Sequence, residues 1–264
     1  MPTNKSKTAK IISVTNQKGG VGKTTTTINL AAALSQLQKK VLIIDLDPQG
    51  NASTGLGVEV EDRELSTYEF LVEGVPLEKV TMETEISGLN IVPATIDLSS
   101  ADIDLISNEK RSHLLHAALR KKQQYKQKYD YILIDCPPSL NILTVNAMVA
   151  SHSVLIPLQS EFFALEGLSQ LLLTVKEVRQ TANENLRVEG IVLTMFDGRN
   201  NLSKQVEADA RSNLRELVFK TIIPRNVRVS EAPSYSMPVL TYDPSSKGSK
   251  AYMSLAKELL ANNS

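Results

Sequence analysis

The sequence predicts an α/β fold: a single doubly wound, mainly parallel sheet with helices on both faces. Short apolar runs rich in Val, Ile and Leu alternate with stretches of helical periodicity along the chain. Strands that alternate with helices pair in parallel, because each helix crosses a face of the sheet. A glycine-rich corner joins the first strand to the first helix, and two later strands end in aspartate. Such a fold binds ligands at the carboxyl edge of its sheet.

The predicted elements follow this alternation in order. Strands are expected to begin at Lys10 and Lys40 and to cover residues 88–94, 129–135, 153–157, 188–196 and 220–224. The first helix runs from the glycine corner through Leu37, and a capping box at 66–69 opens a short helix that ends at Gly74. Further helical stretches are expected to start at Ser99 and to cover 110–128 (an exposed basic helix), 165–180, 202–218 and 248–261.

Composition limits the class of protein. Residues 1–9 are expected to form a flexible basic tail, and residues 10–264 a single domain without an internal linker. Cys136 is the single cysteine, which argues against disulfides and zinc and for a reducing compartment. No apolar run approaches the roughly 18 residues of a membrane span, so we expect no membrane contact and a cytoplasmic location.

The formal net charge is zero, but the charges are unevenly distributed. Residues 59–109 hold 13 acidic residues against two basic ones, residues 110–128 hold seven basic residues and no acidic one, and residues 197–250 hold nine basic and six acidic residues. A neutral total can therefore hide a basic face.

The glycine corner has the residues of a phosphate-binding loop. Its glycines let consecutive N–H groups curl around an anion, and the start of the next helix adds positive potential. The first glycine of the common pattern is replaced by Gln17, and an additional lysine, Lys18, follows it. The candidate nucleotide-binding residues are Lys18, Gly19, Gly20, Val21, Gly22, Lys23, Thr24 and Thr25.

This loop resembles the deviant Walker A motif of the ParA/MinD superfamily of P-loop ATPases. The resemblance implies the P-loop NTPase fold, ATP and Mg²⁺ as ligands, and slow hydrolysis of ATP to ADP and phosphate, with Lys23 on the β- and γ-phosphates. It also implies that Lys18 reaches the nucleotide of a partner subunit, so that ATP joins two copies into a homodimer. A second cation there offsets the charge of two anionic sites.

Two further strands resemble the other signatures of this superfamily. Asp45 and Asp47 are two residues apart at a strand end, so both point to one side of the chain. The resemblance implies that Asp47 positions the attacking water and that Asp45 supports the Mg²⁺ site. Asp135 ends an apolar strand in a Walker B pattern, and it is expected to reach the Mg²⁺ shell together with the Thr24 hydroxyl.

After the last predicted strand, Pro224 and Asn226 match residues that face adenine in this superfamily, where an amide supplies both a donor and an acceptor.

Within the superfamily, the chain resembles the short ParA/Soj branch along nearly its whole length. It lacks the cysteines of nitrogenase-reductase relatives, the C-terminal tyrosine cluster of bacterial tyrosine kinases and the basic membrane helix of MinD proteins. In the ParA/Soj branch an ATP-bound dimer binds double-stranded DNA without sequence preference, and a ParB-type centromere-binding protein stimulates hydrolysis and releases it. The corresponding DNA-binding residues are Arg199 and Arg228, with Lys247 and Lys250 nearby.

This resemblance predicts a chromosome or plasmid partitioning ATPase of the cytoplasm that associates with the nucleoid. The short tail before the first strand cannot hold a helix-turn-helix, so sequence-specific repression is not expected. Two alternatives stay open: a ParA-like ATPase that positions a non-DNA cargo, and an ATP-gated scaffold with negligible turnover.

Overall fold

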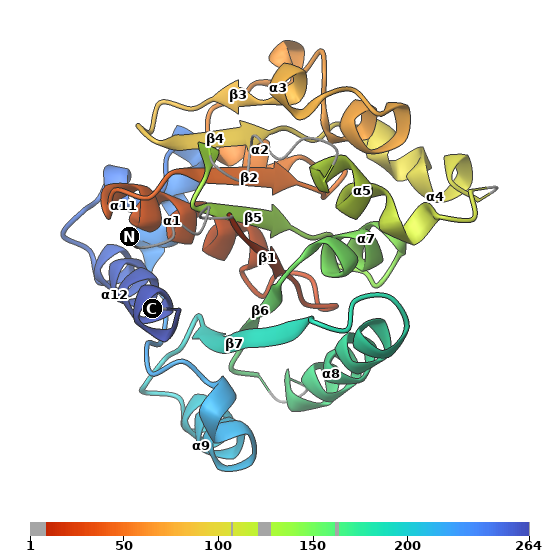
Figure 1. Cartoon of the computed structure of the whole chain (residues 1–264). Coiled ribbons are helices and arrows are strands. Elements are labelled where there is room, and N and C mark those ends of the chain that lie inside the picture. The colour runs from red at the N-terminus through yellow and green to blue at the C-terminus, as the bar shows by residue number, and fades with distance from the viewer. Residues whose placement is uncertain (1–8, 107, 121–127, 162–163, 264) are drawn as a thin grey trace, which may run out of the picture.

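The computed structural model describes residues 9–106, 108–120, 128–161 and 164–263. Its centre is a seven-stranded sheet in the order β3-β4-β2-β5-β1-β6-β7 (Figure 1). The pairs are parallel except for β3–β4, which is antiparallel. The strands are β1 (Lys10–Val14), β2 (Val41–Asp45), β3 (Met82–Glu83), β4 (Leu89–Val92), β5 (Tyr131–Asp135), β6 (Ser153–Gln159) and β7 (Arg187–Thr194).

The register of the three central strands positions their last residues side by side. Val14 and Asp45 both align with Asp135. Because these strands are parallel, their carboxyl ends share one edge of the sheet, and whatever follows each strand converges there.

Helices cover both faces of the sheet (Figure 1). On one face, α1 (Lys23–Gln36) and α12 (Lys247–Asn262) pack against side chains such as Val41 and Ile43. On the other face, α5 (Leu114–Arg120) and α7 (Ile142–Ala150) pack against Leu42 and Ile44, and α8 (Ala164–Thr181) and α9 (Asn201–Leu214) join the core beside β6 and β7. Alternate strand residues therefore serve two cores, as expected for a sheet buried on both faces.

Short helical segments complete the chain. They are α2 (Asn51–Gly55), α3 (Leu77–Val80), α4 (Ala101–Asp104), α10 (Val227–Glu231) and α11 (Val239–Tyr242), with 3-10 turns at Val60–Asp62, Ile96–Ser100, Arg111–His113, Arg215–Leu217 and Ala232–Tyr235 and a π-helical turn at Glu69–Glu73. The predicted capping contact at 66–69 forms, because the Glu69 carboxylate accepts hydrogen bonds from the Ser66 N–H and hydroxyl, both at 2.7 Å. The helix ends as predicted at Gly74, whose φ is 74°.

Two predicted elements are wrong in part. Residues 220–224 make only an isolated bridge instead of a strand, because the N–H groups of Lys220 and Thr221 donate to the Glu258 carboxylate and Pro224 has no N–H. The predicted exposed basic helix at 110–128 is a 3-10 turn followed by α5, which buries Leu115 and Leu119. The rest of it, 121–127, lies outside the described residues.

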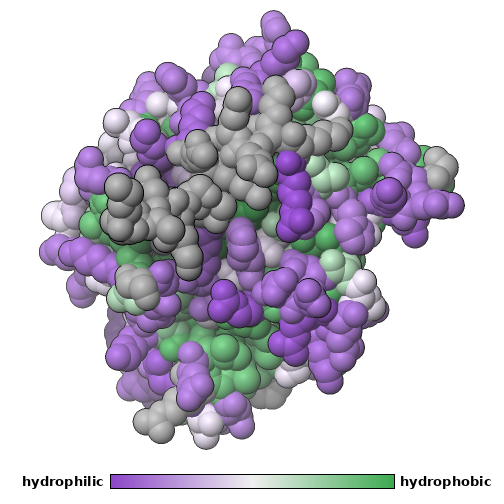
Figure 2. All heavy atoms as spheres, viewed as in Figure 1, coloured by the Kyte–Doolittle hydropathy of each residue, from purple (hydrophilic) through white to green (hydrophobic). Residues whose placement is uncertain are grey.

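Three other predictions concern the ends and the surface of the chain. The predicted helix at 202–218 ends four residues early, at Leu214, and continues as a 3-10 turn. Tail residues 1–8 lie outside the described residues, and Ala9 is buried. Among the described residues, no helix has the length and apolar character to cross a bilayer. Hydrophilic side chains cover most of the face in Figure 2.

Gly190 allows a close approach between β7 and the next segment of the chain. The register of β6 and β7 shifts beside it, at Val154/Leu155, and a Cβ on Gly190 would overlap the buried ring of Phe219. We therefore expect Gly190→Ala to lower the free energy of unfolding by about 1–3 kcal/mol, the usual cost of overpacking. Urea unfolding measures it.

The matched control is Gly167→Ala in α8, where an added Cβ meets no atom within 4 Å. Because alanine favours a helix over glycine by roughly 0.5–1 kcal/mol, this variant should be as stable as the parent or more so. Equal stability of Gly190→Ala and Gly167→Ala would contradict the packing argument.

Candidate nucleotide and magnesium site

The loop between β1 and α1 has the backbone of an anion cradle. Gly20 and Gly22 have φ angles of 74° and 85°, in the left-handed region that favours glycine. Helix α1 begins directly afterwards, at Lys23, with no acidic residue in its first turn. Its free N–H groups and positive end face the loop, which suits a phosphate.

A cleft of about 570 Å³ opens over this loop. The glycine loop forms its floor, the segment after β2 forms one wall, and apolar side chains from later in the chain form another. The lining residues are Gly19, Gly20, Gly22, Lys23, Thr24, Thr25, Ile28, Asn29, Asp47, Gln49, Asn51, Thr54, Gly55, Pro138, Met195, Pro233 and Met237. Six of the eight sequence-predicted loop residues therefore meet Asp47 in one cavity, whereas Lys18 and Val21 do not line it.

Lys23 lies at the bottom of this cleft and is buried. Its Nζ donates to the carbonyl oxygen of Lys18 at 3.0 Å, across the curl of the loop. Burial lowers the pKa of this ammonium, and the carboxylates of Asp135 and Asp47 oppose that shift. A bound phosphate would supply the negative charge that the site needs around the lysine.

Asp135 is fully buried at the end of β5 and is only partly satisfied. Its Oδ1 accepts a hydrogen bond from Thr27 Oγ1 at 2.9 Å, whereas no described residue hydrogen-bonds to Oδ2. Burial and the neighbouring Asp45 raise the pKa of this carboxyl to about 8, against the hydroxyls of Thr24 and Thr27.

This environment fits a hard divalent cation. The Oδ2 of Asp135 is a free buried oxygen, and the Thr24 hydroxyl lies close to the same carboxyl. The described residues contain no group of three or more His, Cys, Asp or Glu side chains able to hold a metal. Mg²⁺ suits such a sparse site, since it keeps several waters and uses phosphate oxygens as ligands.

Asp45 is fully buried beside Asp135, and its oxygens are already engaged. Its Oδ2 accepts hydrogen bonds from the N–H of Ser53 (2.9 Å) and its hydroxyl (2.7 Å), and its Oδ1 accepts one from the Asp47 N–H at 3.2 Å. Burial raises its pKa to about 6. The carboxylate holds the segment after β2 from behind, and Asp45 is not among the residues that line the cleft.

Asp47, by contrast, lines the cleft and is 7% exposed. Its Oδ1 accepts the N–H of Gln49 at 3.0 Å. The carboxylate is thus fixed by its own turn and faces the space above Lys23 and Thr24.

Lys18 points away from this cavity in the single chain. Its Nζ forms an ion pair with Glu161, which follows β6, and the two side chains are 44% and 46% exposed. The N–H of Lys18 donates to Asn16 Oδ1 at 3.0 Å. The sequence does not indicate Glu161 as a partner of Lys18, because the two residues are 143 positions apart and no local pattern links them.

Pro224 and Asn226 are not among the residues that line the cleft. Pro224 pairs with Phe196 in an isolated bridge, and Asn226 caps α10 by accepting the Val229 N–H at 3.3 Å. The apolar wall comes instead from Met195, Pro233 and Met237. Of these, Met195 could have been found from the sequence, because it follows β7 at the carboxyl edge.

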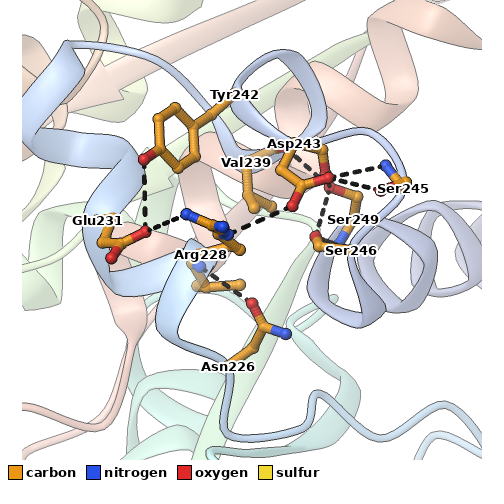
Figure 3. A network of polar contacts seen from close by, with 10 residues as sticks. Asn226, Arg228, Glu231, Val239, Tyr242, Asp243, Ser245, Ser246 and Ser249 are labelled. Atoms are coloured by element: carbon orange, nitrogen blue, oxygen red, sulfur yellow. Dashed lines mark hydrogen bonds and ion pairs between the residues drawn. The ribbon is translucent and has the colours of Figure 1, made fainter.

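The predicted DNA-binding arginines are each paired with carboxylates. Arg199 binds both oxygens of Asp197, at 3.0 and 2.8 Å. Figure 3 shows Arg228 between Glu231 (3.0 Å) and Asp243 (3.5 Å). Tyr242 donates to the same Glu231 carboxylate at 3.3 Å.

The remaining predicted cations lie on a helix that packs against α10. Lys247 and Lys250 belong to the first turn of α12, and a Cβ on Gly248 between them would collide with the Val229 side chain of α10. The Arg225 N–H donates to the Phe196 carbonyl at 2.9 Å, so the turn that holds Arg199 lies beside the segment that leads into α10. The backbone segments that carry the four predicted cations therefore lie near α10.

Comparison with known proteins agrees with this geometry. A family model described as an AAA domain matches residues 9–188. Sporulation initiation inhibitor protein Soj of Bacillus subtilis is 51% identical over 253 residues, 96% of this chain and 99% of that protein. Chromosome partitioning protein ParA of Caulobacter vibrioides is 50% identical over 252 residues, 96% of this chain and 94% of that protein.

Among solved structures, cobyrinic acid a,c-diamide synthase from Mycobacterium smegmatis with bound ATP analog and magnesium has a TM-score of 0.82. It is 35% identical, and the match covers 96% of this chain and 94% of that one.

The buried Asp135 makes the stability of the nucleotide-free, metal-free chain depend on pH. The folded state keeps its proton up to about pH 8, whereas the unfolded chain loses it near 3.8. Between these values the folded state binds more protons, so stability falls as pH rises. We expect Asp135→Asn, which has no such proton, to gain stability over the wild type progressively from pH 5 to pH 8. Urea unfolding at several pH values measures the difference.

Asp197→Asn is the control, because its hydrogen bonds to Arg199 lower the pKa of Asp197 to about 2 and it stays ionised throughout this range. Its stability difference from the wild type should be constant from pH 5 to pH 8. A constant difference for Asp135→Asn as well would rule out the buried proton.

Proposed function

This chain belongs to the ParA/Soj family of chromosome-partitioning ATPases, and on that premise we propose that ATP joins two copies into a dimer that binds DNA without sequence preference. The observation that carries the proposal is the glycine loop itself: one lysine, Lys23, lies inside the cleft, and a second, Lys18, lies half exposed on its outer side. One cation thus serves the chain's own nucleotide, and the other is available to a partner.

ATP binds with its phosphates on the glycine loop and its base toward the apolar wall. The N–H groups at the start of α1 and the Lys23 ammonium hold the β- and γ-phosphates. Thr24 and Asp135 hold Mg²⁺, which neutralises charge on the phosphate oxygens, and Asp45 supports this edge from behind. Pro224 and Asn226 remain proposed adenine contacts, the asparagine through its amide.

Asp47 orients the attacking water, since its carboxylate lines the same cleft as Lys23 and Thr24. Hydrolysis is slow in the isolated protein, because stabilising the charge of the transition state needs more donors than one chain provides. A ParB-type partner completes the site, and hydrolysis then separates the dimer from DNA.

Dimerisation needs Lys18 to exchange one anion for another. Its ion pair with Glu161 is partly exposed on both sides, and exposed pairs contribute only about 0–1 kcal/mol. A triphosphate on the facing subunit offers several charged oxygens and therefore attracts the ammonium more strongly. The ion pair with Glu161 of the same chain thus holds Lys18 near the proposed interface, and breaking it costs little free energy.

DNA binding uses the cations around α10. Arg199, Arg228, Lys247 and Lys250 of both copies contact phosphates, which carry no sequence information. Doubling these contacts steepens the salt dependence, because each neutralised phosphate adds roughly 0.9 to the log–log slope. The protein therefore acts in the cytoplasm on the nucleoid, with DNA retention controlled by nucleotide.

Lys18→Ala should abolish ATP-dependent dimers, because it removes the cation that reaches the second nucleotide. Light scattering after size exclusion, with a non-hydrolysable ATP analogue, measures the mass. Lys176→Ala, an exposed lysine of α8, is the control and should dimerise like the wild type. If Lys18→Ala forms dimers as abundantly as the wild type, Lys18 does not join the two subunits through the nucleotide.

Arg228→Glu should weaken DNA binding in ATP by at least tenfold at moderate salt and still form ATP-driven dimers, since it reverses a phosphate-contacting charge away from the cleft. Fluorescence anisotropy with a duplex of arbitrary sequence measures binding. Arg179→Glu in α8 makes the same charge change on an exposed surface and is the control. Unchanged affinity of Arg228→Glu would remove this residue from the DNA face.

A further inference from the structure

Arg63 is a buried arginine at the start of the acidic segment, and it is 7% exposed. Its guanidinium makes four hydrogen bonds, all to neutral acceptors. Nε and Nη2 donate to the Val58 carbonyl at 3.2 and 2.6 Å, Nη2 also donates to Thr54 Oγ1 at 2.7 Å, and Nη1 donates to the Ala94 carbonyl at 3.0 Å. The side chain therefore ties the segment after β2 to Ala94, the second residue after β4.

The tied segment carries Asp47 and part of the cleft wall. Thr54, one of the acceptors, lines the cleft. Gly50 has a φ of 62°, and a Cβ there would collide with Arg63 Nη1 and lie 2.9 Å from the Ala94 carbonyl oxygen. The Gly50 N–H donates to the Asp47 carbonyl at 2.9 Å. Arg63 thus packs directly on the turn that begins at Asp47.

The Ala94 peptide anchors this segment from two sides. Its N–H donates to Ser53 Oγ at 3.0 Å, and the same hydroxyl donates to Asp45. Its carbonyl accepts from Arg63. Segment 47–54 is therefore held between Asp45 below and Arg63 above, with Ala94 as the common fixed point.

The charge of Arg63 is costly for folding alone. Burial lowers the pKa of its guanidinium, although the negative charge of Asp45 opposes this shift. A well-packed apolar side chain commonly replaces a buried charge without loss of stability. Five N–H donors in a rigid fork, however, can fix three backbone segments at once, which no apolar residue does.

We propose that Arg63 is a positioning residue for ATP hydrolysis: it fixes segment 47–54 so that the Asp47 carboxylate meets the attacking water in the productive geometry. The inference rests on the proposed role of Asp47. The γ-phosphate and Mg²⁺ would be held by the glycine loop, Lys23, Thr24 and Asp135, so the loss of Arg63 should change ATP affinity far less than it changes the rate. A misplacement of about 1 Å at a reacting group can cost about 100-fold in rate.

The test measures phosphate release at saturating ATP and, separately, the affinity for a fluorescent ATP analogue. Arg63→Met should lower kcat at least tenfold and change the dissociation constant less than about twofold. Arg63→Lys keeps the charge but not the fork, so it should lose rate in the same direction. Arg179→Met in α8 should match the wild type in both measurements.

A combined variant separates positioning from general damage. In an Asp47→Ala background, Arg63→Met should cause no further loss of kcat, because the group that it positions is gone. A further loss of tenfold, or a loss of nucleotide affinity that parallels the loss of rate, would overturn the inference. If Arg63→Met does not fold, kcat of Arg63→Lys is compared in the wild-type and Asp47→Ala backgrounds instead, with the same expected and contradicting outcomes.

The roles of Asp47 and Arg63 can be rejected separately. If Asp47→Ala alone hydrolyses ATP at the wild-type rate, the proposed role of Asp47 is wrong. Slow hydrolysis by Asp47→Ala together with a wild-type rate in both Arg63 variants would leave that role intact and reject only the positioning by Arg63.

Discussion

The structure depends on a pair of buried carboxyl groups at the carboxyl edge of the sheet. Parallel pairing sets Asp45 directly beside Asp135, and both are fully buried. Burial and the neighbouring carboxylates oppose their ionisation, while Lys23 lies close enough to act on Asp135 and Arg63 close enough to act on Asp45. The neighbouring residues reflect this constraint. Ser53 donates hydrogen bonds to Asp45, and Thr27 donates to one of the two oxygens of Asp135. The glycine loop leaves room for a ligand that brings a metal.

Much of this edge could be predicted from local sequence, for physical reasons that act over a few residues. Glycines at positive φ, an apolar run that ends in aspartate and a lysine at the start of a helix have few alternative structures. The predicted loop therefore forms, Asp47 and Lys23 meet in one cleft, and the sheet takes the expected mainly parallel topology. The capping contact between Ser66 and Glu69 is likewise local and forms as predicted.

What could not be predicted depends on contacts between distant segments. Glu258 in α12 takes the amide hydrogens of residues 220 and 221, which turns an expected strand into a bridged segment. Glu161 forms an ion pair with Lys18, which lies 143 residues earlier in the chain. Arg63 donates a hydrogen bond to the carbonyl of Ala94, beyond β4. In each case a side chain forms a hydrogen bond or an ion pair with a group in another element. The periodicity of the sequence does not predict such contacts. Asn226 shows the same limit, because one amide can cap a helix or face a base.

The segment that follows α9 also decides how the sheet ends. Residues 218–224 run beside the outer side of β7, where Phe219 and Ile223 donate to the carbonyls of Ile191 and Leu193. The opposite margin is β3, a strand of two residues. Neither border offers a long row of free amides to which another polypeptide could add, the usual route to uncontrolled aggregation. Under the proposed function the protein associates reversibly with its own copies, and these two borders keep that association from proceeding by sheet extension.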